Sequence, residues 1–140
     1  MNTKKEFITI MKGQTDMALA TTINNQPNVR IVNFYYHQDN NIIYFVSLKD
    51  NDKVTELRNN NQVAFTTIPH YGSRHVKGQA VVKESKLSIF DIKDDFIKQV
   101  PDIKDVFDNA ATDLILFEIA FDEVIVTIDF TNINILNFRE

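Results

Sequence analysis

Alternating apolar residues towards the C-terminal end of the chain constrain its fold most strongly. The alternation runs through two segments: Ile115, Phe117, Ile119 and Phe121 in residues 113–121, and Val124, Val126, Ile128 and Phe130 in residues 124–130. A period of two predicts β-strands that each bury one face. Only a tight turn fits between the two segments, and parallel strands need a much longer connection, so the strands are expected to be antiparallel neighbours.

The rest of the chain also predicts strands that follow one another directly, with few and scattered helices. Further strands are expected at residues 17–23, 30–37, 42–47, 63–68 and 73–83, and helices at residues 3–12, 52–60, 85–100 and 102–109. The assignment of residues 131–140 is left open. This order predicts a mainly β fold of the antiparallel barrel type, closed or partly closed, with peripheral helices and a single domain over residues 1–140.

Composition excludes several classes of function. The net charge of −4 disfavours general binding to nucleic acid, and the absence of cysteine excludes disulfides, thiolate catalysis and cysteine-held metals. Three glycines cannot build a Gly-rich dinucleotide or P-loop motif. The N-terminal segment lacks the apolar run of a signal peptide, and no segment is apolar enough to span a bilayer. We therefore expect a cytoplasmic protein that does not associate with membranes.

The segment from Arg30 to Lys53 is the best candidate for a binding site. It places Arg30 in a strand, Ser47 at the end of the next strand, and Lys53 at the start of a helix that Asp52 is expected to cap. Cations, a hydroxyl and unpaired helix amides together suit a phosphate group. Asp50 and Asp52 oppose an anion, however, so an arginine at the barrel edge and an ordinary solvated loop remain open as alternatives.

The histidines do not indicate a metal site. His37, His70 and His75 lie in different predicted elements, and the spacing of known zinc motifs is absent. We expect no metal. The sequence also singles out no catalytic acid, base or nucleophile.

Four segments of the chain resemble the pyridoxamine 5′-phosphate oxidase-like flavin-binding split β-barrels. They read R-I-V-N-F-Y from Arg30, I-I-Y-F-V-S from Ile42, D-K-V-T-E-L-R-N-N-N-Q-V-A-F-T from Asp52 and R-H-V-K-G-Q-A-V-V from Arg74. The resemblance covers roughly residues 17–82. Its most specific part is the helix and strand that begin at Lys53.

The resemblance implies an obligate homodimer with FMN in a groove at the subunit interface. Arg30 and Lys53, aided by Ser47, would bind the FMN phosphate. The main chain of Ile31, Val32, Asn33 and Val46 would border the isoalloxazine ring. Arg74 would reach the cofactor bound mainly to the partner chain.

The chain also departs from the true pyridoxamine phosphate oxidases of this family. Asp52 stands where they have a basic residue, the chain contains no tryptophan, and their C-terminal substrate motif is missing. Oxidation of a B6 vitamer is therefore not implied. We expect an FMN-dependent oxidoreductase acting on a small-molecule substrate. A deazaflavin in place of FMN, a non-catalytic flavin- or haem-binding or stress-related module, and a barrel without cofactor are the alternatives.

Overall fold

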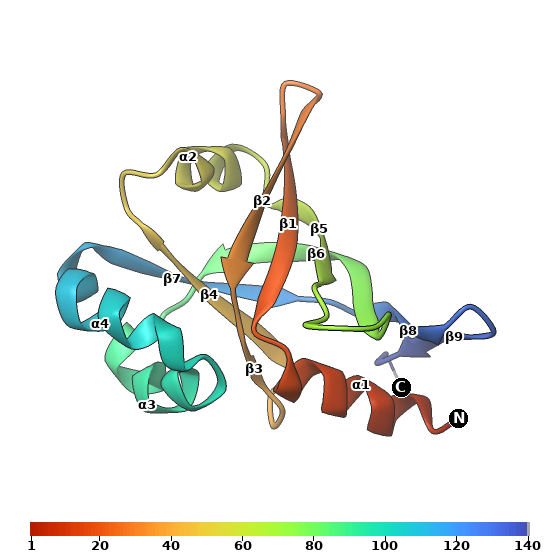
Figure 1. Ribbon diagram of the computed structural model, residues 1–140. Coiled ribbons are helices and arrows are strands. Elements are labelled where there is room, and N and C mark those ends of the chain that lie inside the picture. The colour runs from red at the N-terminus through yellow and green to blue at the C-terminus, as the bar shows by residue number, and fades with distance from the viewer. Residues whose placement is uncertain (140) are drawn as a thin grey trace.

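The computed structural model describes residues 1–139 and shows an antiparallel sheet curled into a half-barrel with helices at its periphery (Figure 1). The helices are α1 (Thr3–Gly13), α2 (Asp52–Asn59), α3 (Ile89–Gln99) and α4 (Lys104–Ala110), with short 3₁₀ turns at Pro101–Ile103 and Ala111–Asp113. The strands are β1 (Asp16–Ile23), β2 (Gln26–Asn33), β3 (Tyr35–His37), β4 (Ile42–Leu48), β5 (Gln62–Thr67), β6 (His75–Glu84), β7 (Leu114–Ala120), β8 (Glu123–Asp129) and β9 (Asn132–Asn137). The predicted mainly β, antiparallel class is confirmed.

The strands are ordered β2-β1-β5-β6-β7-β4-β3, and β8 adds to β6 and β9 to β8. The long strand β6 has two partners on the same side: its residues 75–77 pair with β8, and its residues 81–84 pair with β7. Because β6 pairs with β7 and with β8 along different parts of its length, it connects the two halves of the barrel. Every strand pair among the described residues is antiparallel.

A two-residue turn joins β1 to β2 and sets the register of this hairpin. Asn24 and Asn25 have φ angles of 51° and 62°, which asparagine tolerates better than most residues. Pro27 lies within β2 and not in the turn, opposite Thr22. Proline has no backbone N–H to donate. Because β2 is an edge strand, Pro27 removes no essential hydrogen bond between strands.

The structure corrects the predicted strand over residues 30–37. It is divided between β2, which pairs with β1, and β3, which pairs with β4. Between them, the buried Phe34 donates its backbone N–H to the Thr15 carbonyl at 3.0 Å. The chain thus leaves one half of the barrel and enters the other, and this change of partner has no local sequence signal.

Helix boundaries also differ from the prediction. The side chain of Asn51, not Asp52, caps α2 by accepting from the Lys53 N–H at 3.0 Å. Asn2 caps α1, although Thr3 is the cap that the sequence predicts. Ser88, one of the two predicted caps of α3, does cap it, and Asp91 completes a capping box. A candidate cap one residue away from the true one is common, because several residue types accept equally well.

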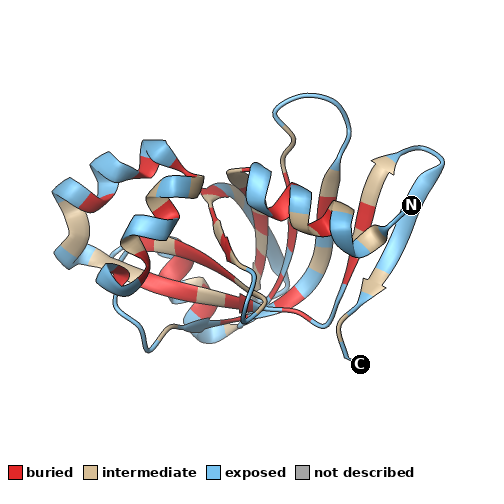
Figure 2. Cartoon of the chain, turned by 90° about the horizontal axis from the view of Figure 1, so that it is seen from below, coloured by how far each residue is buried: buried red, intermediate tan, exposed pale blue. Residues whose placement is uncertain are grey.

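Two apolar clusters lie on opposite faces of β4 and β7. The first fills the barrel with residues of the strands and α1, among them Phe7, Phe45 and Phe117. The second packs α3 and α4 against the outside, with Phe96 and Phe107 over Tyr44. Figure 2 shows the buried positions (red) along the strands and on the inner sides of the helices. Burial on both faces explains why β4 reads as a nearly continuous apolar run.

Gly78 in β6 marks a close approach of two strands, one of the two features, with a β-bulge, that a glycine inside a strand indicates. A Cβ atom here would lie 3.1 Å from the Glu123 carbonyl oxygen and 3.3 Å from Cγ1 of Val124. The absence of a side chain lets β8 come close to β6 at the point where the pairing of β6 changes from β8 to β7.

Candidate functional site

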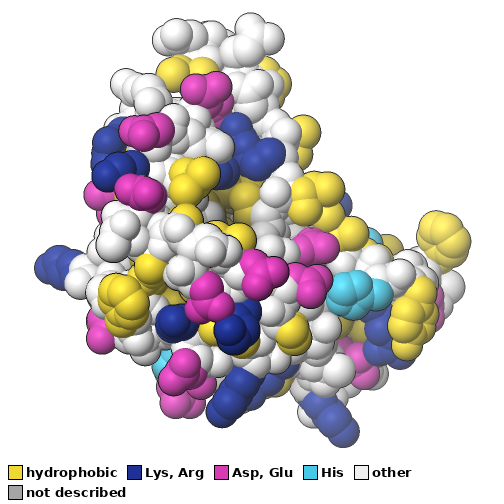
Figure 3. Space-filling view, turned by 60° about the vertical axis from the view of Figure 1, so that its left-hand side comes forward, with side chains coloured by type: hydrophobic (Ala, Val, Ile, Leu, Met, Phe, Trp, Pro, Cys, Tyr) yellow, Lys and Arg dark blue, Asp and Glu magenta, His cyan; other side chains and the backbone are white. Residues whose placement is uncertain are grey.

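A hollow of about 390 Å³ lies where β2, β4, the start of α2 and the α4 region meet. It is lined by Arg30, Ile31, Val32, Asn33, Val46, Asn51, Lys53, Ile103 and Val106. Figure 3 looks onto the side of the molecule that carries α2 and α4, where basic, acidic and apolar side chains surround a depression. The volume falls within the range of about 300–1,000 Å³ usual for small-molecule sites.

Six of the eight predicted cofactor-binding residues line this hollow. They are Arg30, Ile31, Val32, Asn33, Val46 and Lys53. The alternation of β2 turns the side chains of Arg30 and Val32 inward and leaves Ile31 67 % exposed on the other face. Segments from one strand, a second strand and a helix start therefore meet at this hollow.

Lys53 is a nearly buried cation at the start of α2. The residue is 9 % exposed, and its Nζ donates to the hydroxyl of Ser47 at 2.8 Å. An ammonium group has three donors, so further N–H groups are available to a ligand. Burial lowers the pKa of Lys53, and the Arg30 charge lowers it further, while the Glu56 carboxylate raises it.

Arg30 is held in place by an acidic partner that the sequence did not indicate. Its Nη2 donates to the Glu56 carboxylate at 2.6 Å, and its Nη1 donates to the Thr21 hydroxyl at 2.7 Å and the Leu19 carbonyl at 3.3 Å. The side chain of Arg30 is 23 % exposed and that of Glu56 is 13 % exposed. Arg30, which we predicted to bind the phosphate, thus already uses one edge of its guanidinium in an ion pair with Glu56.

Ser47 and Arg74, the other two predicted residues, do not line the hollow. Ser47 lies directly behind Lys53, is 3 % exposed, and donates to the Leu48 carbonyl at 3.0 Å. It therefore positions the lysine. Arg74 lies just before β6, and its guanidinium donates to Glu6 in α1 at 2.7 Å. Its predicted contact with a partner chain's cofactor stays a prediction.

Three lining residues escaped the sequence reasoning. Asn51 could have been found, because asparagine before a helix is a common cap. Ile103 and Val106 form an apolar wall from a region more than fifty residues further along the chain. Ordinary apolar residues in a short helix carry no local signal that they face a site.

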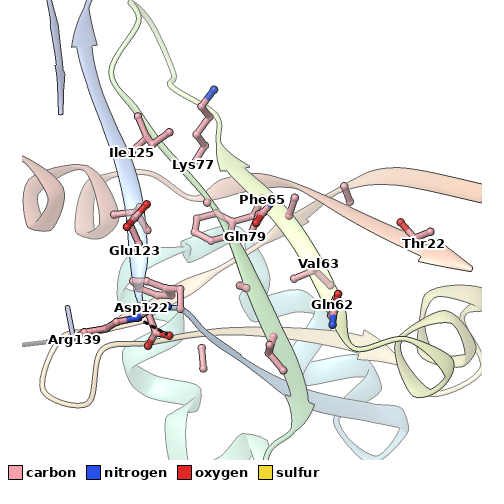
Figure 4. Close-up of a pocket in the computed structure, with 18 residues that line it drawn as sticks. Thr22, Gln62, Val63, Phe65, Lys77, Gln79, Asp122, Glu123, Ile125 and Arg139 are labelled. Carbon is pink, nitrogen blue, oxygen red and sulfur yellow. Dashed lines mark ion pairs between the residues drawn. The ribbon is translucent and has the colours of Figure 1, made fainter. Parts of the chain in front are cut away.

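A larger hollow of about 900 Å³ lies on the other side of the sheet (Figure 4). It follows the outer face of β5 and β6 and the β7–β8 connection, where Asp122 and Arg139 form an ion pair at 3.4 Å. The cations that line it are Lys77 and Arg139, and Arg139 is the one paired with Asp122. Its size alone does not make it the better phosphate site.

The described residues contain no group of three or more histidine, cysteine or acidic side chains arranged to hold a metal ion. Within the same residues, no helix has the length and apolar character needed to cross a bilayer.

The model of the pyridoxamine 5′-phosphate oxidase-like family matches residues 10–133. This chain belongs to that family. The matched range includes the whole candidate site and eight of the nine strands in full. No curated protein sequence matches the chain.

Solved structures show the same fold at low sequence identity. General stress protein 26 from Bacillus anthracis has a TM-score of 0.77 at 16 % identity, over 98 % of this chain and 99 % of that one. HutZ, a haem storage protein from Vibrio cholerae, has a TM-score of 0.71 at 17 % identity, over 90 % and 95 %. An FAD-binding protein from Mesorhizobium loti has a TM-score of 0.65 at 17 % identity, over 86 % and 90 %. The fold therefore occurs in proteins named for different cofactors.

Proposed function

We propose that this protein binds FMN, with the phosphate at Lys53 and Arg30. The observation that carries the proposal is the nearly buried Lys53 ammonium, which has spare donors and faces a hollow beside a second cation. Glu56 offsets one of the two positive charges, and a phosphate would supply negative charge for the other. The cap and first turn of α2 add a favourable helix dipole.

The remaining walls of the hollow suit a flat, partly apolar ring. The main chain of β2 offers N–H and C=O groups from Ile31 to Asn33, and Val46, Ile103 and Val106 supply apolar contacts. Ring systems of this kind are commonly held by backbone hydrogen bonds and aliphatic side chains. The available groups therefore fit a flavin.

Haem fits the same hollow less well. Haem iron takes a histidine, cysteine, methionine or tyrosine as axial ligand. None of these residue types is among those lining the hollow in the described chain. Flavin is favoured for this reason, although one structural neighbour is named as a haem storage protein.

We further propose an oxidoreductase role on a small-molecule substrate. A bound flavin supplies the hydride and electron chemistry, and the protein supplies binding and orientation. Arg30 and Lys53 are the titratable residues that line the hollow, and both are assigned to the phosphate. We therefore assign no side chain of this chain as a catalytic acid or base.

We also propose that the chain acts as a homodimer through the outer face of β2, β1, β5 and β6. Small side chains, Ala18, Ala20 and Ala64, form the middle of this face, and Val29 and Val81 are 69 % and 48 % exposed beside them. This face, which borders the larger hollow and adjoins the candidate site at Ile31, suits a second copy. Val29→Glu with Val81→Glu should give monomers in size-exclusion chromatography with light scattering. A wild-type monomer at micromolar concentration would refute the proposal.

The cofactor proposal is tested with Arg30→Ala/Lys53→Ala, using Lys49→Ala as the control. Lys49 is also a cation near α2, but it is 55 % exposed and pairs with Asp113. The purified wild type should contain a flavin whose mass identifies FMN and excludes a deazaflavin. The double variant should be folded but lose FMN, whereas the control keeps it. Stoichiometric FMN in the double variant would show that the phosphate lies elsewhere.

Reduction by NAD(P)H separates an enzyme from a storage module. An oxidoreductase that uses a nicotinamide donor should lose its flavin absorption on anaerobic addition of NADH or NADPH. Retention of the oxidised spectrum with both donors would contradict that role and leave flavin binding alone.

A further inference from the structure

Glu56 is an acidic side chain built into a site that we assign to an anion. Its Oε2 accepts from Arg30 at 2.6 Å and from the Thr21 hydroxyl at 2.5 Å, and its Oε1 accepts from the Asn28 amide at 3.1 Å. The side chain is 13 % exposed. A carboxylate repels phosphate, so its place beside Arg30 and Lys53 calls for a physical reason.

The first reason is geometric. Arg30 comes from an edge strand, and a free arginine there would extend into water. Glu56 and Thr21 instead fix two of its nitrogens, and Thr21 also donates to the same carboxylate oxygen. This closed triangle of hydrogen bonds holds the guanidinium before any ligand binds. A preorganised group loses less freedom on binding.

The second reason is electrostatic. Lys53 is buried, and the charged groups that act on it are Arg30 from β2 and Glu56 from its own helix. From β4 it meets the neutral hydroxyl of Ser47, and across the hollow the apolar Ile103 and Val106. Without Glu56, two cations would face each other with no compensating charge.

We propose that Glu56 is a positioning residue of the anion site, which holds the Arg30 guanidinium and offsets its charge beside the buried Lys53. This inference rests on the proposed phosphate site for its functional meaning. It explains why a carboxylate lies at the site. Glu56 lowers the net attraction for an anion, but it holds Arg30 in the place that binds the anion and offsets the repulsion between the two cations.

The electrostatic part is tested without any ligand. NMR follows the titration of the Lys53 ε-carbon in the wild type, in Glu56→Gln and in Glu84→Gln. Glu84 also pairs with an α2 side chain, Arg58, at 2.7 Å, but on the exposed surface. Glu56→Gln should move the Lys53 titration to lower pH, because burial and Arg30 then act unopposed, and Glu84→Gln should not. An unmoved titration in Glu56→Gln would overturn the proposal.

The positioning part is tested by the preference for FMN over riboflavin, which lacks the phosphate. Glu56→Ala should reduce this preference about tenfold, the change expected when one charge-assisted hydrogen bond is lost. Glu56→Gln can still accept from Arg30 and Thr21 and should retain the preference near neutral pH, then lose it at a lower alkaline pH than the wild type. An unchanged preference in Glu56→Ala would refute the positioning role. Equal binding of FMN and riboflavin by the wild type would instead refute the phosphate site, while the NMR titration still decides the effect on Lys53.

Discussion

Replacing Lys53 by methionine separates ligand binding from folding more cleanly than any other single change at the site. Methionine keeps most of the length and apolar volume of the lysine side chain. The Arg30–Glu56 ion pair stays intact, so no buried charge loses its partner. The Ser47 hydroxyl no longer accepts a hydrogen bond from Lys53, but it still donates to the Leu48 carbonyl.

The expected loss of FMN affinity follows from one hydrogen bond to a charged group. Such bonds contribute about 1.5–3 kcal/mol, which corresponds to roughly 10- to 150-fold in Kd. Riboflavin, which has no phosphate, should bind the variant and the wild type alike. The fold should gain about 1 kcal/mol in free energy of unfolding, because replacing a buried charge with an apolar group is commonly neutral or stabilising.

The stability gain should depend on pH. The pKa of Lys53 is lowered by burial in the folded protein, so the cost of its charge is present below that lowered pKa. The cost disappears as the pH rises from there towards the ordinary value of 10.5. The difference in stability between variant and wild type should therefore shrink at alkaline pH.

The assays are flavin fluorescence titration of the apoprotein and urea unfolding, with Lys49→Met as control. Lys49 is exposed, so its replacement should change neither the preference for FMN nor the pH dependence of stability. If Lys53→Met binds FMN and riboflavin in the same ratio as the wild type, Lys53 does not contact the phosphate. If the variant is much less stable at neutral pH, the burial argument is wrong.

Three further predictions concern the fold around the site. Gly78→Ala should lower the free energy of unfolding by about 1–3 kcal/mol, because its Cβ would press on the Glu123 carbonyl; Gly13→Ala, which meets nothing within 4 Å, should not. Gln99→Ala should cost about 1–3 kcal/mol in urea unfolding, since its amide links the carbonyls of Met11 in α1 and of the cap residue Gln14 to a β3 N–H. An unchanged midpoint would contradict this. The pKa of Glu56 is lowered below 4.5 chiefly by the Thr21 hydrogen bond, so its contribution to stability is complete above that pH and lost below it. The stability difference between wild type and Glu56→Gln should accordingly shrink as urea unfolding is repeated below pH 4.5, and a constant difference would refute the reasoning.

Most strands and helices could be predicted because their patterns are local. The alternation in residues 113–130 corresponds to β7 and β8, and the helical spacing after Ser88 corresponds to α3. β9 was missed although Asn132 to Ile135 alternate polar and apolar residues, because the segment is short and rich in asparagine, which is depleted in strands. Its alternation does not bury one face either: Ile133 and Ile135 are 52 % and 64 % exposed.

The candidate site was predictable only in part. The sequence predicted that Arg30, Ser47 and Lys53 converge, and the family resemblance added Val46. Arg30, Val46 and Lys53 line one hollow, whereas Ser47 lies behind Lys53. Whether that hollow holds FMN stays a proposal. The pairing of Arg30 with Glu56 and the wall formed by Ile103 and Val106 were not predicted.

The sequence by itself determined the antiparallel β class, the order of most elements and the presence of two cations near one strand end. These depend on periodicity, capping and turn chemistry, which act between residues close together in the chain. Only the tertiary structure decided which charges meet. Arg30 and Glu56 are 26 residues apart, and their contact depends on how β2 and α2 pack across the barrel. Lys53 becomes a buried cation for the same reason, because the elements that cover it come from distant parts of the chain.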